Sequence, residues 1–240
     1  IRMIDCVGYV VKAAKGYEDE NGPRLVMTPW YSEPIPFTEA AEIGTEKVIK
    51  EHSTIGIVVT TDGSIGDIPR SEYVEAEKAV IEELNAVGKP YIVLLNSVHP
   101  MLPDTETLAD KLKEEYNVPV MPISIEAMQE RDMYNILKEA LYEFPIEQIK
   151  VNMPEWIAIL APDHYLKKEY IAKIKEAITE VNKLKDIDKI NNNFTESEYI
   201  AKSYISEVDP STGEVTINLE APQGLYSKTL NDIMGISVSS

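Results

Sequence analysis

Apolar and polar residues follow one another along the first 145 residues in blocks that predict strands and helices in turn. Three runs are apolar throughout and rich in β-branched residues: "STIGIVVTT" (53–61), "YIVLLN" (91–96) and "VPVMPIS" (118–124). A shorter run over residues 1–5 ends at Asp5. Strands that are apolar on both faces are typical of a parallel sheet with helices on either side. The pattern therefore predicts an α/β fold.

Between these runs, apolar residues recur every three or four positions, which is the spacing of amphipathic helices. One such helix ends at Gly88, a residue type common at helix C-termini, and Thr38 is expected to cap another. The predicted helices cover residues 39–52, 73–87, 106–116 and 133–144. Residues 9–37 are rich in Gly, Pro and acids and are expected to be irregular.

After Pro145 the pattern changes to that of a smaller α+β region. We predict an alternating strand over 146–160, a long helix over 166–181, a loop at the Asn run 191–193, a short helix capped by Thr195 with Glu198, a hairpin over 204–222 and a final helix over 225–233. The sequence thus predicts two domains, residues 1–145 with a parallel sheet and residues 146–240 with an α+β fold.

Composition excludes several function classes. The 240 residues include 41 acids and 23 bases, for a net charge of −18, which argues against nucleic acid as a partner. The single cysteine, Cys6, excludes an internal disulfide and fits a reducing cytosol. No apolar run reaches the length of a membrane span, and the three histidines are too far apart for a zinc motif. Because the chain begins inside a predicted strand, we expect it to be a piece of a longer protein.

The segment "DCVG" (Asp5–Gly8) follows the first predicted strand. An Asp at this place can hold Mg²⁺ through water, and the N–H of a Gly three residues later can approach a γ-phosphate. The alternative is an ordinary acidic turn at the end of a strand.

Two further polar residues follow later strands. Asn96 can tie neighbouring loops together and face the N7 edge of a purine, or it is simply a turn residue. Ser124, in "MPISIEA", can lie against a base together with Ala127, or it caps the next helix. Ligands of open α/β sheets bind beyond the carboxyl ends of the strands, where these residues are expected.

The order of these features matches a GTPase core from its third strand onward. In GTPases the residue at position 99 would be an Asp that accepts two hydrogen bonds from guanine. His99, with Ser97 in place of a Lys, cannot supply that paired acceptor, so guanine specificity should be lost and ATP becomes plausible.

Longer stretches carry a more specific resemblance. "DCVGY", "GYEDENGPRLVMTPW", "EPIPFTEAAEIGTEKVI", "HSTIGIVVTTDGSIGDIPRSEYVEAE" and "GKPYIVLLNS" together resemble the stage IV sporulation protein A family, the spore-coat morphogenetic ATPases of endospore-forming bacteria. The resemblance implies a GTPase-like P-loop fold that hydrolyses ATP with Mg²⁺. It also implies Asp5 as the Mg²⁺-side acid, Gly8 as the phosphate-sensing glycine, and Asn96 near the base.

The same resemblance implies partners and a location. The family assembles with itself into a layer on the forespore surface, on the cytoplasmic side in the mother cell. That layer is the base for spore-coat proteins, and a small amphipathic membrane peptide anchors it.

The phosphate-gripping loop of the family, G-x-x-x-x-G-K-[ST], does not occur in this chain. Its lysine and backbone N–H groups supply most of the triphosphate binding, so we expect the chain alone to be inactive. In GTPase-like sheets the strand before that loop lies between the first and second strands predicted here. The chain is then expected to receive that strand from elsewhere, to close the gap, or to associate through the open edge.

Other readings remain. A degenerate nucleotide fold used only for assembly is the main alternative, whereas a flavodoxin-like binder would not explain the order of Asp5, Gly8, Asn96 and Ser124. Trp30 in the acidic loop either contacts another subunit or pins the loop to the core. Asp62, in "TTDG", is a candidate for coupling nucleotide state to that loop.

Overall fold

The computed structural model describes residues 2–19, 22–179, 181–194 and 197–235. The chain divides into two compact units, residues 1–140 and 141–240, which are described separately.

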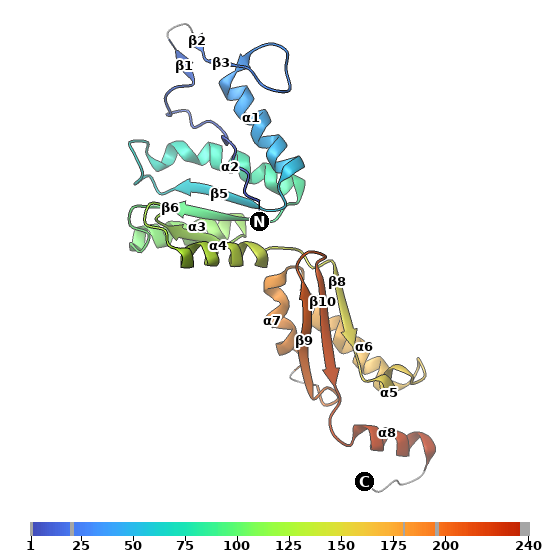
Figure 1. Ribbon diagram of the computed structural model, residues 1–240. Coiled ribbons are helices and arrows are strands. Elements are labelled where there is room, and N and C mark those ends of the chain that lie inside the picture. The colour runs from blue at the N-terminus through green and yellow to red at the C-terminus, as the bar shows by residue number, and fades with distance from the viewer. Residues whose placement is uncertain (1, 20–21, 180, 195–196, 236–240) are drawn as a thin grey trace. The chain divides into compact units, whose positions relative to one another are not determined.

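The first unit is built on a three-stranded parallel sheet. Its strands are β5 (Gly56–Thr61), β6 (Tyr91–Asn96) and β7 (Val120–Ile123), hydrogen-bonded in the order β5-β6-β7. The arrows of β5 and β6 point the same way in Figure 1. The predicted parallel sheet is therefore confirmed, and the carboxyl ends of its strands meet at one edge.

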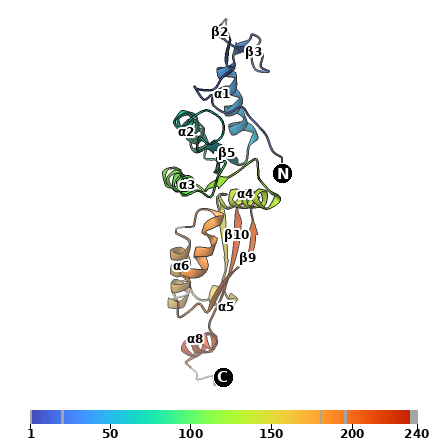
Figure 2. The same cartoon turned by 90° about the vertical axis from the view of Figure 1, so that its left-hand side faces the viewer.

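Helices cover both faces of this sheet. These helices are α2 (Arg70–Val87), α3 (Pro103–Tyr116) and α4 (Glu130–Tyr142). Val93 of β6 packs with residues of α2, and Leu95 packs with residues of α3. Ile92 and Leu94 pack with residues of α4. Figure 2 shows α4 on the side of the sheet away from α3. Alternate β6 side chains point to opposite faces, and both faces are covered, which explains why the strand is apolar throughout.

The segment before β5 differs from the prediction. Residues 2–7 form no strand, so the strand predicted over 1–5 is wrong for the residues described, and Ile1 lies outside them. Within the described chain β5 pairs only with β6. The strands predicted over residues 1–5 and 53–61 therefore do not pair with each other to close the gap left by the absent strand. A strand needs a neighbour for its N–H and C=O groups, and an apolar run alone cannot provide one.

Residues 17–52 form short pieces and one longer helix. Two-residue strands pair as β1 (Glu18–Asp19) with β2 (Gly22–Pro23) and as β3 (Leu25–Val26) with β4 (Ile35–Pro36). Helix α1 (Phe37–Lys47) then continues into the π-helical turn η1 (Val48–His52). Pro36 occupies the cap position and Thr38 lies inside the first turn, so the predicted Thr38 cap is wrong.

Trp30 lies against α1. A Cβ at Gly44 would be 3.6 Å from the Trp30 ring, and Lys47 Nζ lies 5.6 Å from the ring centroid. Trp30 remains 45% exposed and belongs to none of the buried clusters. It thus attaches the acidic loop to the surface of α1 rather than to the core, and a contact with another subunit stays a prediction.

The second unit contains a mixed three-stranded sheet. Its strands are β8 (Gln148–Asn152), β9 (Lys202–Asp209) and β10 (Glu214–Glu220). The central strand β10 runs parallel to β8 and antiparallel to β9, so the predicted hairpin is confirmed (Figure 1).

Helices pack on one face of this second sheet. The remaining elements are α5 (Glu155–Ala158), α6 (Tyr165–Ile178), η2 (Leu184–Asp186), α7 (Ile187–Asn193) and α8 (Leu225–Met234). Val215, Ile217 and Leu219 of β10 pack with Leu166 and Tyr170 of α6. The other face is polar: Lys150 pairs with Glu214, and Asn152 Nδ2 donates to Asn218 Oδ1.

Three predictions in this unit need correction. The run over 146–160 is not one strand, because Pro154 ends the extended segment and α5 follows it. The Asn run 191–193 is the end of α7 rather than a loop. Thr195 of the predicted capping box lies outside the described residues, and residues 197–200 are not helical.

Candidate nucleotide-binding site

Hydrogen bonds join the loops at the carboxyl edge of the parallel sheet. Asp62 Oδ1 accepts from the backbone N–H and the hydroxyl of Ser64, and Asp62 Oδ2 accepts from Thr105 Oγ1 at 3.1 Å. Burial alone would raise the pKa of Asp62, but the hydrogen bonds from these hydroxyl and amide groups outweigh it and lower the pKa. Asp62 therefore fastens the loop after β5 to the start of α3.

Asn96 links the next pair of loops. Its Oδ1 accepts from the backbone N–H of Ile125 at 3.0 Å, which ties the end of β6 to the loop after β7. Ser97 is 1% exposed, and its Oγ accepts from the N–H of His99, whose side chain is exposed. Ser64 Oγ also accepts from the N–H of Val98. The loops after β5, β6 and β7 thus form one connected platform.

Ser124 lies at this edge as well. It is half-buried and follows β7 directly, whereas Ala127 is exposed. Helix α4 begins only at Glu130, so Ser124 does not cap it. The capping alternative for Ser124 is wrong, because five residues, 125–129, separate it from the helix.

Asp5 and Gly8 lie in the segment before β1. Asp5 is exposed and, among the described residues, makes no hydrogen bond or ion pair. Gly8 has φ +78°, and its N–H donates to Thr45 Oγ1 at 3.0 Å. The structure thus brings Asn96 and Ser124 together, but no contact in the described chain joins Asp5 or Gly8 to them.

The loops at this edge carry acids but no cations. The three loops, residues 62–69, 97–102 and 124–129, are described in full and contain no Lys or Arg, whereas Arg70 and Arg131 lie in the first turns of the helices that follow. Asp62, Asp67 and Glu126 are the acids of the loops, and Asp104, Glu106 and Glu130 lie in the first turns of α3 and α4. A triphosphate needs cationic partners, so these loops by themselves do not form a phosphate site. In the part of the chain that the structure describes, no three metal-ligating side chains gather either, and Asp5 alone does not fit a Mg²⁺ site.

A buried ionic network beside the platform was not anticipated from the sequence. Arg70 donates from both terminal nitrogens to Glu77, at 2.6 and 2.7 Å, and from Nη1 to Thr60. Tyr116 donates to Glu77 Oε1 at 2.6 Å. Burial by itself would raise the pKa of Glu77, but these partners lower it. The sequence did contain a signal for this network. Arg70 and Glu77 are seven residues apart, and they lie on the face of α2 that also carries its apolar residues.

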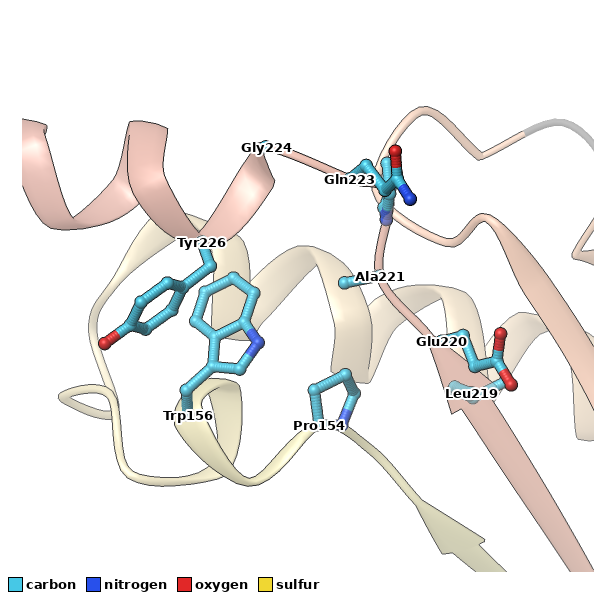
Figure 3. Close-up of a pocket in the computed structure, with 9 residues that line it drawn as sticks. Pro154, Trp156, Leu219, Glu220, Ala221, Gln223, Gly224 and Tyr226 are labelled. Atoms are coloured by element: carbon cyan, nitrogen blue, oxygen red, sulfur yellow. The ribbon is translucent and has the colours of Figure 1, made fainter. Parts of the chain in front are cut away.

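Hollows elsewhere are less suited to chemistry. In the second unit a cavity of about 550 Å³ lies between the segment around Pro154 and the start of α8, with Trp156 and Tyr226 on its wall (Figure 3). Their rings meet edge to face, with centroids 5.4 Å apart. Glu220 is the one ionisable acid or base in its lining apart from the Tyr226 phenol, so the cavity lacks paired catalytic groups.

Among the helices that the structure describes, none combines the length and the apolar content required to cross a membrane.

Comparison with known proteins covers almost the whole chain. Residues 1–145 match the family described as "Stage IV sporulation protein A, ATPase domain", and residues 146–240 match "Stage IV sporulation protein A, middle domain". Proteins named stage IV sporulation protein A from Bacillus subtilis (strain 168) and Bacillus anthracis are each 50% identical over 99% of this chain. The protein of that name from Clostridioides difficile (strain 630) is 41% identical over the same share.

The chain spans about half the length of these curated relatives, 48% in each case. No solved structure matches it. Both family matches and all three relatives agree with the resemblance carried by the sequence motifs, so the chain belongs to the stage IV sporulation protein A family of sporulation proteins, with the ATPase domain of that family in its first 145 residues.

Proposed function

We propose that this chain is part of a protein that hydrolyses ATP and assembles with copies of itself into the basement layer of the spore coat. The layer would lie on the forespore surface in the mother-cell cytoplasm. Spore-coat proteins and a small amphipathic membrane-anchoring peptide would be its partners. The match to the ATPase domain supports nucleotide binding, and the named relatives support a role in sporulation.

One observation carries the nucleotide part of the proposal. Asn96 bridges the loops after β6 and β7 at the edge where α/β sheets bind ligands. Beside it, Ser97 is buried, its Oγ accepts from the N–H of His99, and its hydroxyl also interacts with Asp62, so it is engaged within the protein. Neither Ser97 nor His99 supplies the paired acceptor that guanine needs, so ATP is the substrate we propose.

The proposed roles extend to four residues. Asn96 and Ser124 would contact the base and Gly8 would sense the γ-phosphate. Asp5 would contribute to Mg²⁺ binding through water only together with further ligands from the remainder of the full-length protein. Residues 1–145 would form the nucleotide-binding domain and residues 146–240 a separate middle domain. Because the loops of this chain lack cations, the phosphate cradle must come from the remainder of the full-length protein, and the chain alone would neither bind nor hydrolyse ATP appreciably.

Binding of a fluorescent ATP analogue to the full-length protein tests the proposal. Asn96→Ala should weaken binding about tenfold, since it removes the link between the two loops and any contact to the base. Asn85→Ala, at an exposed position on α2, is the matched control and should bind as the parent does. Equal affinity of the Asn96 variant and its control, or preference for GTP over ATP, would contradict the proposal. Robust release of phosphate from ATP by this chain alone would contradict the proposal that the phosphate-binding groups come from the remainder of the full-length protein.

A second candidate function is a degenerate nucleotide fold used only for assembly. The three acids and the lack of Lys and Arg in the three described edge loops favour it. It predicts that the full-length protein assembles equally well with and without ATP. Light scattering during assembly, in ATP and in ADP, separates the two functions.

A further inference from the structure

Gly8 is held by a buried hydroxyl group of α1. Thr45 lies inside this helix and is 1% exposed, and its Oγ1 accepts the Gly8 N–H at 3.0 Å. The two residues are 37 positions apart, so this is a tertiary contact rather than a local turn. A buried hydroxyl oxygen that accepts from a distant backbone N–H fixes the position of that N–H.

The residues after Gly8 are also fastened to α1 and α2. Tyr9 is half-buried. Burial is the largest cause that raises the pKa of its hydroxyl, and the negative charges of Glu83, Glu42 and Glu46 raise it further. Lys12 Nζ pairs with Glu75 of α2 at 2.7 Å. In contrast, residues 2–7 are exposed and form no strand. Gly8 is therefore the first anchored point of the chain, and Thr45 is its anchor.

The geometry at Gly8 explains why a glycine stands there. The φ angle of Gly8 is +78°, in the left-handed region that side chains rarely allow. Space is not the reason for a glycine, because a Cβ at this position would have no atom within 4 Å. The backbone conformation, and not the packing, requires glycine. That conformation directs the N–H toward Thr45, and one N–H can make only one strong hydrogen bond at a time.

We propose that Thr45 is the positioning residue of Gly8, and that its hydroxyl holds the Gly8 N–H whenever no phosphate group does. This inference rests on the proposed phosphate-sensing role of Gly8. A γ-phosphate that accepts the Gly8 N–H must first displace Thr45, so binding of the triphosphate and the contact with α1 exclude each other. After hydrolysis and phosphate release, Thr45 recovers the N–H.

The exchange has a consequence for α1. Trp30 packs at Gly44, the residue before Thr45, and holds the acidic loop to the same helix. Loss of the Gly8 contact therefore frees a buried acceptor next to the attachment point of that loop. Thr45 links the phosphate-sensing glycine to the segment that carries Trp30.

Hydrogen exchange of the Gly8 amide in this chain, without nucleotide, tests the contact itself. The Gly8 amide should be protected in the parent chain. Thr45→Val, which keeps the shape and removes the hydroxyl, should reduce protection about fivefold, the factor for one net hydrogen bond. Thr45→Ser keeps the hydroxyl and should restore protection. Equal exchange in all three chains would overturn the inference, and unchanged exchange of the β6 amides shows that the Val variant is folded.

ATP binding by the full-length protein tests the competition. Thr45→Val should bind ATP about fivefold more tightly than the parent, because no hydrogen bond has to be broken first, and Thr45→Ser should bind as the parent does. If the parent binds ATP and the Val variant binds it equally, the inference fails while the proposed function stands. If the parent itself binds no ATP, both fail.

Discussion

Strand β5 lies at an edge of the first sheet and strand β9 at an edge of the second, but only β9 has the features of an edge strand. β5 carries no charged residue, pairs with β6 in an unbroken register, and exposes 56% of Val59. β9 carries Lys202, Glu207 and Asp209, and its ladder to β10 is interrupted by a bulge. Charges and bulges are the devices by which proteins keep an edge strand from pairing with another chain. β9 is thus built as an edge, whereas β5 has the character of an inner strand.

The comparison also shows what holds β5 in place. In the described chain β5 is hydrogen-bonded on one side only, to β6. Near its carboxyl end, Thr60 Oγ1 accepts a hydrogen bond from Arg70, which belongs to the ionic network around Glu77. β9 belongs to a sheet whose central strand, β10, is covered by helices on one face, where Val215, Ile217 and Leu219 are buried. The ionic network is therefore the feature of the first unit whose loss should matter most.

The largest expected effect is from Glu77→Gln. Arg70 would be left as a buried charge without its counter-ion, which costs about 3 kcal/mol of unfolding free energy. Urea unfolding followed by circular dichroism measures this loss. Glu75→Gln, two residues earlier on α2 in an exposed pair with Lys12, is the control and should leave the midpoint unchanged. Similar midpoints for the two variants would show that the network does not hold β5.

The pH dependence gives a second measure of the same network. Because the pKa of Glu77 is lower in the folded chain than in the unfolded one, its stabilising contribution is complete above the unfolded value of about 4.5. It is lost as the pH falls through the folded value. Glu77→Gln should therefore be less sensitive than the parent to acid below about pH 4.5.

A smaller effect is expected from Tyr170→Phe in the second unit. Tyr170 is fully buried, and its hydroxyl donates to the carbonyl of Tyr199 at 2.6 Å. Loss of this bond should cost about 1 kcal/mol in urea unfolding. Tyr204→Phe, on the exposed face of β9, is the control and should be neutral. If Tyr170→Phe lowered the free energy of unfolding as much as Glu77→Gln, the ionic network of the first unit would be no more important than a single buried hydrogen bond of the second.

Tyr170 also sets an alkaline limit. Burial raises its pKa to about 12, above the unfolded value of about 10. Its contribution to stability is complete below about pH 10 and is lost as the pH rises through about 12. Tyr170→Phe should remove that part of the alkaline loss.

The smallest change in folding stability, below about 0.5 kcal/mol, is expected from Val59→Lys on β5. Its effect should instead be on association, because a charge on an open inner-type strand blocks pairing with a second copy. Sedimentation velocity over a range of concentrations should show less self-association than in the parent. Val208→Lys on β9 is the matched control and should sediment as the parent does. A parent chain that is monomeric throughout would exclude association through β5.

The sequence predicted elements whose signals are local. β6, α2 with its Gly88 terminus and the β9–β10 hairpin follow from apolar spacing and turn residues, and all are present. The position of Asn96 at the carboxyl edge followed from the strand order alone.

What could not be predicted depends on partners distant in the chain. A strand at residues 1–5 would need a hydrogen-bonded neighbour, and residues 2–5 pair with none of the described strands. The contact from Gly8 to Thr45 spans 37 residues, and the one from Tyr116 to Glu77 spans 39. Such pairings leave no periodic trace, since each involves a single donor and a single acceptor. The Thr45 hydroxyl in particular looks like an ordinary helix residue until Gly8 is seen beside it.

The acidic platform at the carboxyl edge of the parallel sheet has an electrostatic consequence. The described loops carry three carboxylates and no Lys or Arg, and the first turns of α3 and α4 add three more carboxylates, so the platform repels a second surface of the same sign at distances up to roughly 10 Å in 0.1 M salt. Crowding many copies of a chain of net charge −18 into one layer therefore concentrates counterions around it. Any assembly of this chain should consequently grow faster as ionic strength rises.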